Sequence, residues 1–457
     1  MKTALVVGSG FEGLACAHYL RDVYQLEVTL IDSAPSIGGV MRGFSVGSFH
    51  YDFGCQVFDN FDARVSRAIV ALSGHECEFD DITYGGRFGG KMTTDVSVPD
   101  LTSLDPQTIA KIETEVQETR QDGLNAHTLA DYFQRRWGTT AATILERIST
   151  KMLDAPAAEL DQSSRIYAGL NRLKVFRDDD QALKLKKADP LMDAKVAVPR
   201  ATAAFYEKSQ QDIPFQNIIP VPRSFGGFCE TARHALTTNG INFQLDTRLE
   251  GLEINPDTQA AQATGVTKSG EQIHVDADLV VWCAPFEQLC DILDVNGKTA
   301  EFLSPIGTTI TYFVAPRAAI NPLGYMQNYD ADMRFFRWSS MGLYSRQVTP
   351  DGLSFCCIET PSQHSADTDT PQAEALRDWE DLRALDLVSG QPAQPPMRKF
   401  IPGVIKRRRP GYTAAAAEAM QKLALQTGSA MVYQKPDSFG RTPTARTLFD
   451  EIDVVMS

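Results

Sequence analysis

The start of the chain combines apolar runs with a segment of helical spacing. Residues 3–7 form a short run rich in β-branched side chains, which is typical of a buried parallel strand. Residues 11–21 carry apolar side chains at helical spacing, and residues 26–31 form a second apolar run. The pattern predicts a β-α-β unit.

The hydrophobic pattern changes character further along the chain. An alternating stretch with turn glycines, residues 78–101, predicts a hairpin or small sheet at the edge of the first domain. Helical spacing then extends from residue 104 to about 203, and within it the charged stretch 178–187 favours a solvated loop or a helix end. Strands are predicted at 240–243, 277–285, 307–315 and 333–360, and an alanine-rich helix at 412–426.

Three glycines with GxGxxG spacing lie between the first predicted strand and helix. Gly8 allows a tight turn, Gly10 lets a pyrophosphate approach the backbone, and Gly13 lets the helix pack closely on the strand. The helix begins at Phe11 and Glu12, so its free amides and positive end face the phosphates. The alternative is a glycine-rich turn that binds nothing.

Asp32 ends the second predicted strand, a little over about 20 residues after the first glycine. Its carboxylate can accept hydrogen bonds from an adenosine ribose and would repel a 2′-phosphate, which argues against NADP. Gly38 and Gly39 follow, with Arg42 close behind, where a plain NAD-binding unit would continue into another βαβ unit. This arrangement resembles the superfamily of amine oxidases, protoporphyrinogen oxidases and UDP-galactopyranose mutases. The resemblance implies FAD as the cofactor.

Four short matches, spread over almost the whole chain, resemble UDP-galactopyranose mutase more than the other branches. They are residues 51–58, Pro222 with Gly226-Gly227-Phe228, Leu343-Tyr344-Ser345-Arg346, and Phe439-Gly440-Arg441 followed by Phe449-Asp450. The resemblance implies that Arg346 is the catalytic residue, near the flavin and the substrate phosphates. It also implies cofactor contacts by Gln56, Val57, Phe58, Gly440 and Arg441, and substrate contacts by Tyr344 and Asp450.

Other residues of the candidate substrate site carry alternatives. Arg172, Lys174 and Arg177 fall where the mutases place an arginine for the diphosphate, although a charge run is usually a solvated face. Asp450 has the alternative role of a cap on the final helix. Residues 407–409 are three arginines, for which we expect a solvated turn over a phosphate clamp.

The sequence also departs from the mutase pattern. The histidine of the flavin stretch is Gln56 here, and the two tyrosines before the closing aspartate have no clear match, with Leu448 and Phe449 nearby. Those tyrosines hold the diphosphate in the mutases. The departures therefore predict a nucleotide sugar other than UDP-galactose.

Two enzymatic functions follow from the resemblance. The first is a nucleotide-sugar pyranose/furanose mutase of surface polysaccharide biosynthesis, in which reduced FAD forms an N5–sugar adduct and an external donor such as NAD(P)H reduces the flavin. The second is an FAD-dependent oxidoreductase of the amine oxidase or desaturase kind. A flavin-binding scaffold without activity is the third alternative.

The composition limits the partners and the compartment. The chain has 457 residues and a net charge of −14, which argues against nucleic acid and against a basic membrane-binding face. No apolar run approaches the ~20 residues of a membrane span, and the first strand begins too early for a signal peptide. The eight cysteines have neither metal nor disulfide spacing. We expect a cytoplasmic protein without a metal site, with room for a homodimer.

These predictions combine into an α/β fold with three parts. The first is a discontinuous Rossmann-like FAD-binding domain, built from residues 1–103, 216–300 and 427–457. The second is a helical insertion over residues 104–215. The third is a second, antiparallel sheet domain that holds the substrate, over residues 301–426.

Overall fold

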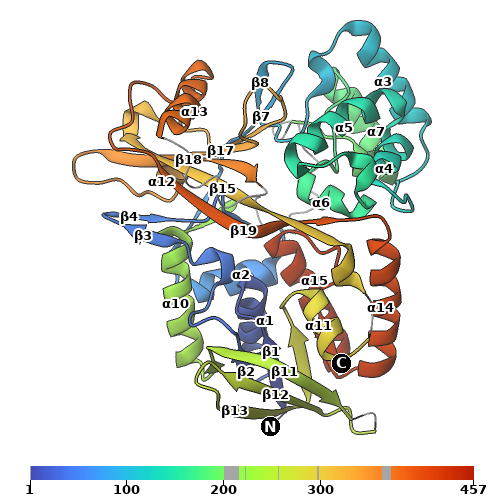
Figure 1. Cartoon of the computed structure of the whole chain (residues 1–457), viewed down its shortest axis with the longest axis vertical. Coiled ribbons are helices and arrows are strands. Elements are labelled where there is room, and N and C mark those ends of the chain that lie inside the picture. Colours follow the sequence, from blue (N-terminus) through green and yellow to red (C-terminus); the bar gives the residue numbers. More distant parts are fainter. Residues whose placement is uncertain (1, 200–215, 222, 256, 296–297, 363–371) are drawn as a thin grey trace. The chain divides into compact units, whose positions relative to one another are not determined.

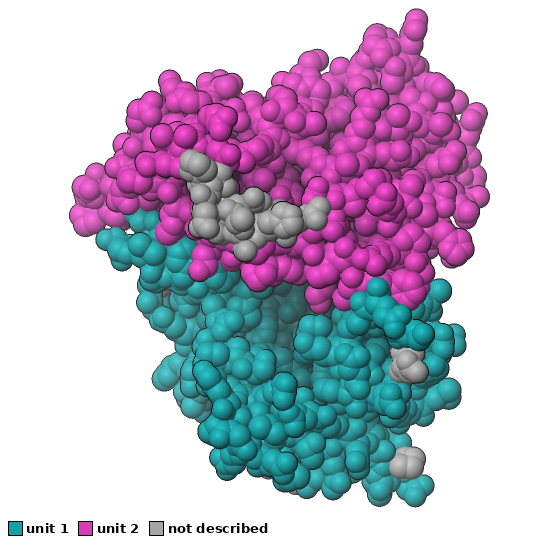
Figure 2. Space-filling view, viewed as in Figure 1, with its two compact units in different colours: residues 1–80, 210–301, 414–457 teal, residues 81–209, 302–413 magenta. Residues whose placement is uncertain are grey.

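The computed structural model divides the chain into two compact units, coloured in Figure 2. Unit 1 contains residues 1–80, 210–301 and 414–457, and unit 2 contains residues 81–209 and 302–413. Two predictions, Pro222 in the second mutase-like match and residues 200–215 of the helical insertion, lie outside the described residues. The structure describes residues 2–199, 216–221, 223–255, 257–295, 298–362 and 372–457.

Unit 1 is built on a parallel sheet of five strands in the order β10-β2-β1-β14-β20. Figure 1 labels β1 and β2 of this sheet. The central strand β1 (Thr3–Val7) pairs with β2 (Glu27–Ile31) and β14 (Leu279–Trp282). The edge strands β10 (Asn242–Gln244) and β20 (Met431–Tyr433) come from distant parts of the sequence. The predicted Rossmann-like α/β fold is confirmed, because the apolar runs form parallel strands buried on both faces.

Helices and small sheets complete unit 1. The helix α1 (Phe11–Asp22) packs against α15 (Arg441–Met456), and Tyr19 stacks on Phe449 at 4.0 Å between ring centroids. The same core contains α2 (Ala63–Leu72) and α10 (Ser224–Thr238). The other elements are η1 (Gly39–Met41), β3 (Phe44–Val46), β4 (Phe49–Tyr51), β5 (Phe58–Asp59), β6 (Cys77–Asp80), β9 (Asn217–Pro220), β11 (Thr247–Ile254), β12 (Ala261–Thr267), β13 (Gln272–Ala277) and α11 (Phe286–Ile292).

The helices of unit 2 have their own hydrophobic core. Trp137 and Phe133 are fully buried in it. The charged stretch 178–187 is a helix, because Asp178 accepts hydrogen bonds from the amides of Asp180 and Gln181 and caps its first turn. The helices are α3 (Pro106–Glu118), α4 (Leu129–Trp137), α5 (Thr139–Leu153), α6 (Arg165–Ala168), α7 (Asp179–Ala188) and α8 (Pro190–Lys195).

The second part of unit 2 is a sheet of seven strands in the order β19-β15-β18-β17-β16-β7-β8. The hairpin β7–β8 was expected at the edge of the cofactor domain, but β7 pairs with β16 and belongs to this sheet. Gly86 in β7 leaves room for the segment that follows β8, because a Cβ there would lie 2.7 Å from the backbone oxygen of Val96. The strands are β7 (Tyr84–Phe88), β8 (Lys91–Thr94), β15 (Leu303–Pro316), β16 (Tyr325–Asn328), β17 (Arg337–Ser339), β18 (Leu353–Ser362) and β19 (Met397–Arg408).

The segment 333–360 is not continuous strand. Between β17 and β18 the chain forms a short helix, α12 (Met341–Tyr344), in which Gly342 packs against the backbone of Phe355. The remaining helices are α13 (Gln372–Ala384) and α14 (Tyr412–Thr427), and α14 confirms the predicted alanine-rich helix. Among the described residues, no helix has both the length and the apolar composition needed to cross a membrane.

Candidate functional site

A cavity of about 770 Å³ lies in unit 1 at the carboxyl ends of β1, β2 and β14. Ligands bind at this edge of open parallel sheets. The sequence predicted its first wall, the glycine turn with Asp32. It did not predict the opposite walls, because a strand pattern does not show which other strands lie beside its end. These walls are Thr247–Glu250, Trp282–Pro285, Gln288, Asp291 and Ile292.

The three glycines of the first turn meet different surroundings. Gly8 has a φ of +98°, in the left-handed region, and a Cβ on Gly13 would lie 1.8 Å from the carbonyl oxygen of Gly8. A Cβ on Gly10 would meet only one carboxylate oxygen, Oε2 of Glu12, at 3.5 Å. Gly8 and Gly13 are thus required by the fold itself, whereas the open side of Gly10 leaves space for a ligand.

Asp32 is held in position by hydrogen bonds within the turn. The amide and the hydroxyl of Ser9 both donate to its Oδ2 at 2.6 Å, and the amide of Ala34 donates to Oδ1 at 2.8 Å. Ser9 was not predicted as a site residue, since GxGxxG leaves this position unspecified. The carboxylate lines the cavity with Ser33, so the turn fits the pyrophosphate and the ribose of a dinucleotide.

The second glycine pair packs directly on the first turn. Gly38 donates its amide to the carbonyl oxygen of Ser9 at 2.7 Å, and a Cβ on Gly39 would lie 3.5 Å from the Cα of Gly10. Both glycines have positive φ. Arg42 donates to the carbonyl oxygen of Gly39 at 3.0 Å and to Ser36. The pair extends the phosphate turn, and these residues fit an extended dinucleotide such as FAD.

The residues expected beside the flavin divide into polar and core positions. Gln56 is buried and accepts a hydrogen bond of 2.7 Å from Arg441, which follows Gly440, the N-cap of α15. Phe11 and Phe58 are buried in the core, with ring centroids 4.6 Å apart. Their side chains pack unit 1, so only their backbone atoms are left for the predicted cofactor contacts. Val57 between these positions is half-buried.

A buried acid lies within the same flavin stretch. Asp52 is 1% exposed, accepts a hydrogen bond from the hydroxyl of Ser224, and lies 3.8 Å from Nε2 of His50. Burial raises the pKa of Asp52 to about 7, against the opposing effects of Ser224 and Arg441. Asp52 belongs to the mutase-like match over residues 51–58, but no local pattern in the sequence predicts its burial.

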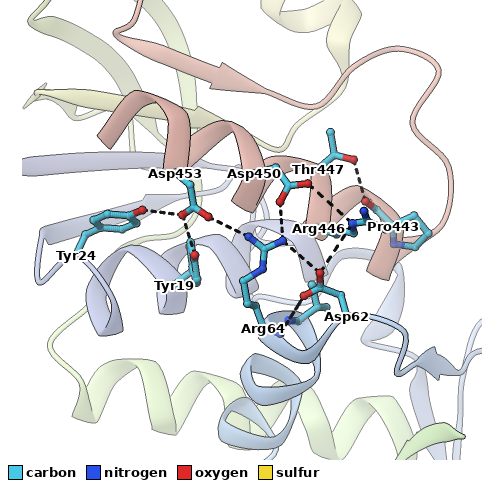
Figure 3. A network of polar contacts seen from close by, with 10 residues as sticks. Tyr19, Tyr24, Asp62, Arg64, Pro443, Arg446, Thr447, Asp450 and Asp453 are labelled. Atoms are coloured by element: carbon cyan, nitrogen blue, oxygen red, sulfur yellow. Dashed lines mark hydrogen bonds and ion pairs between the residues drawn. The ribbon is translucent and has the colours of Figure 1, made fainter. Parts of the chain in front are cut away.

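Asp450 is engaged by a surface network of unit 1 (Figure 3). It lies inside α15 rather than at its start, so the capping alternative is wrong. Arg64 donates to it at 2.6 Å and also binds Asp453 at 2.9 Å. Asp453 accepts further hydrogen bonds from Tyr19 and Tyr24. The carboxylate of Asp450 connects α15 to α2, which is a structural role.

The basic residues of unit 2 have unequal surroundings. Lys174 is buried and forms an ion pair of 2.5 Å with Asp179, so its charge is used inside the unit. Arg177 is exposed and donates to the carbonyl oxygen of Leu104, and Arg172 is half-buried. Contact of these residues with a substrate phosphate stays a prediction. Arg172 and Arg177 fit it better than Lys174, whose charge is already paired with Asp179.

The three arginines at 407–409 do not form the expected solvated turn. Arg407 and Arg408 end β19 and are 8% and 3% exposed. Arg407 donates to the carbonyl oxygens of Leu153 and Asp154, and the guanidinium of Arg408 lies 4.4 Å from the ring centroid of Tyr412. Backbone carbonyls and an aromatic face compensate their burial, so these arginines stabilise unit 2.

Arg346 lies at the end of α12, not inside a strand. Its φ is +55°, its amide donates to Leu343, and the next amide, of Gln347, donates to Gly342. This is the hydrogen-bond pattern of a left-handed helix end, at which glycine is the usual residue. The side chain of Arg346 is exposed, and the neighbouring Tyr344 is buried. A backbone conformation that disfavours arginine is therefore kept at the predicted catalytic residue.

Comparisons with known proteins agree with this architecture. A family model described as an NAD(P)-binding Rossmann-like domain matches residues 6–72. Among curated proteins, none matches the chain. A solved structure of reduced UDP-galactopyranose mutase has a TM-score of 0.68 and 14% sequence identity, and the match covers 100% of this chain and 96% of that one.

Two other solved structures match at similar extent. A putative protoporphyrinogen oxidase from Exiguobacterium sp. 255-15 has a TM-score of 0.63 at 13% identity, covering 100% of this chain and 99% of that one. Cyclohexylamine oxidase from Brevibacterium oxydans IH-35A has 0.59 at 12% identity, covering 99% of each chain. At these identities the likeness concerns the fold. The shared fold extends over 99–100% of this chain.

Proposed function

We propose that this protein is an FAD-dependent enzyme that interconverts the pyranose and furanose forms of a nucleotide sugar. The observation that carries the proposal is Arg346, an arginine in a left-handed conformation at a helix end that glycine would occupy more easily. The four matches to UDP-galactopyranose mutase and the full-length likeness to its structure support it.

The dinucleotide is held by unit 1. Asp32 would hold the ribose, the turn from Gly8 to Gly10 and the first turn of α1 would hold the pyrophosphate, and Gln56 with Arg441 would contact the flavin. When bound and reduced, FAD supplies the nucleophile for the anomeric carbon of the sugar. A donor such as NAD(P)H supplies the electrons. The protein positions the sugar and balances the charge of the diphosphate.

The phosphates of the substrate are bound by unit 2. Arg346 presents a planar guanidinium that can hold a phosphate through two parallel hydrogen bonds. Arg172 and Arg177 supply further positive charge, whereas Lys174 is committed to Asp179. Leu448 and Phe449, which stand near the place of the mutase tyrosines, carry no hydroxyl and are buried in the core of unit 1, so they supply no diphosphate ligand. We therefore propose a sugar nucleotide other than UDP-galactose.

An oxidase of the amine-oxidase kind is the second candidate. The observation that favours it is the similar likeness to putrescine oxidase, with a TM-score of 0.60 at 11% identity. The two functions differ in electron balance. An oxidase substrate reduces the flavin, and a mutase substrate leaves its redox state unchanged.

The experiment is a panel of UDP-, GDP- and dTDP-sugars, incubated with the dithionite-reduced protein under argon and analysed by NMR. We expect ring contraction or expansion of at least one sugar, and none with the oxidised protein. Efficient conversion of UDP-galactofuranose would contradict the altered substrate. Stoichiometric reduction of the oxidised flavin by an amine or another substrate, seen as bleaching, would contradict the proposed mutase function.

A further inference from the structure

A carboxylate lies beside Gly10, in the glycine turn that is proposed to bind the negatively charged pyrophosphate. Glu12 is in the first turn of α1, and its Oε2 would lie 3.5 Å from a Cβ on Gly10. Gly10 is the glycine whose open side admits the pyrophosphate. A pyrophosphate at this turn and an ionised Glu12 would therefore be like charges in close contact, at a half-buried position.

The groups around Glu12 leave it little compensation. From α15, Arg441 is the cation that acts on Glu12, and it also donates to Gln56 and acts on Asp52. From the turn after β14, Cys283 is kept neutral, since a hydrogen bond with Cys16 and burial raise its pKa.

From the end of β2, Asp32 adds a second carboxylate, which Ser9 holds. Within α1, a backbone amide in the first turn favours the charged form of Glu12. One guanidinium thus acts on two acids, the half-buried Glu12 and the buried Asp52, and a bound dinucleotide adds two negative charges.

We propose that Glu12 takes up one proton when the dinucleotide binds, and that the neutral carboxylic acid donates a hydrogen bond to a phosphate oxygen. The proton comes from solvent, so the bound state holds one proton more than the free protein and FAD together. Glu12 would then make cofactor affinity depend on pH. This inference rests on the proposed FAD binding and adds a residue that tunes it.

The direction of the pH dependence follows from the free protein. Burial raises the pKa of Glu12, in spite of its backbone hydrogen bond and Arg441. A bound pyrophosphate raises the pKa further. Affinity is highest below the pKa of the free protein, decreases as the pH rises between the two values, and is constant above the higher one.

The test measures FAD affinity of the full-length apoprotein by flavin fluorescence, from about pH 5.5 to about pH 8.5. For the wild type we expect the Kd to rise by up to tenfold per pH unit over part of this range. In Glu12→Gln, which keeps the shape and a hydrogen-bond donor, we expect a nearly constant Kd. Asp52→Asn is the matched control, since Asp52 also titrates near neutrality, and it should keep the slope.

Calorimetry on the wild type provides a second measurement that needs no variant. Titrations in buffers of different ionisation enthalpy should report the uptake of about one proton per FAD bound within the sloping range. A slope that persists in Glu12→Gln, or that disappears only in Asp52→Asn, overturns the proposal. No proton uptake, or a slope abolished by EDTA, which would indicate a bridging cation, also overturns it. A protein that binds no FAD at any pH refutes the proposed function as well.

Discussion

The two units use different means to form their candidate sites. In unit 1 the site is made chiefly by backbone, since Gly8, Gly13 and Gly38 are required by close contacts and positive φ, and Ser9 holds Asp32 in place. In unit 2 it depends on exposed side chains, of which Arg346 is the clearest. A site built from backbone leaves a strict pattern in the sequence, and one built from side chains can change its ligand without changing the fold.

Two glycines of the same turn should respond in opposite ways to a methyl group. In Gly13→Ala the Cβ would lie 1.8 Å from the oxygen of Gly8, so α1 must shift from β1. We expect a loss of ~3 kcal/mol or more in unfolding free energy, the upper range for overpacking. Gly10→Ala should keep its stability and lose FAD affinity, and Gly10→Val should be colourless. Thermal denaturation and bound flavin content separate the two effects. Full FAD occupancy in Gly10→Val would remove Gly10 from the site.

Substitution of Arg346 should separate activity from stability in unit 2. Arg346→Gly and Arg346→Ala should each cost ~2–4 kcal/mol of transition-state stabilisation, the range for a preorganised electrostatic group. Glycine at the left-handed position should also raise the unfolding free energy by ~1 kcal/mol, whereas alanine should not. Turnover and urea denaturation measure both quantities. If Arg346→Gly were fully active, the left-handed backbone conformation of Arg346 would have no functional explanation.

The buried acid of unit 1 should make stability depend on pH. The pKa of Asp52 in the folded protein, about 7, is above its ordinary value of 3.8, so folding favours the neutral form of this carboxyl group. The associated stability is present below about pH 4 and is lost as the pH rises to about 7. Asp52→Asn should remove this loss and raise the unfolding free energy at pH 8 by up to ~3 kcal/mol. An equal pH dependence in the two proteins would show that Asp52 is not the group responsible.

The smallest effect is expected at Asp450. Its carboxylate pairs with Arg64 at the surface, so Asp450→Asn should lower the unfolding free energy by ~0.5–1 kcal/mol and leave the KM unchanged. Arg64→Met, which removes the centre of the same network, is the control and should have an equal or larger effect on stability. A rise in KM for the nucleotide sugar in Asp450→Asn alone would restore the substrate role.

The difference between the units also decides what the sequence could predict. Strand β1, helix α1, the glycine turn and Asp32 were predictable, because contacts between near neighbours determine them. The hairpin β7–β8 was assigned to the wrong unit, since its partner β16 is more than two hundred residues away in sequence. The burial of Arg407 was missed for the same reason, since its partners are the distant carbonyl oxygens of Leu153 and Asp154. Lys174 and Arg408 have partners close in sequence, Asp179 and the ring of Tyr412, but no local pattern shows that the surrounding chain buries them.

The central claim is a redox-neutral reaction of a nucleotide sugar on reduced FAD. The most direct measurement follows the visible flavin absorbance and the NMR spectrum of the sugar in one anaerobic sample, with the protein first oxidised and then reduced by dithionite. The account predicts no conversion by the oxidised protein, and after reduction many turnovers of the sugar without any change in the flavin spectrum. Conversion by the oxidised protein, with one flavin reduced per product formed, would contradict it.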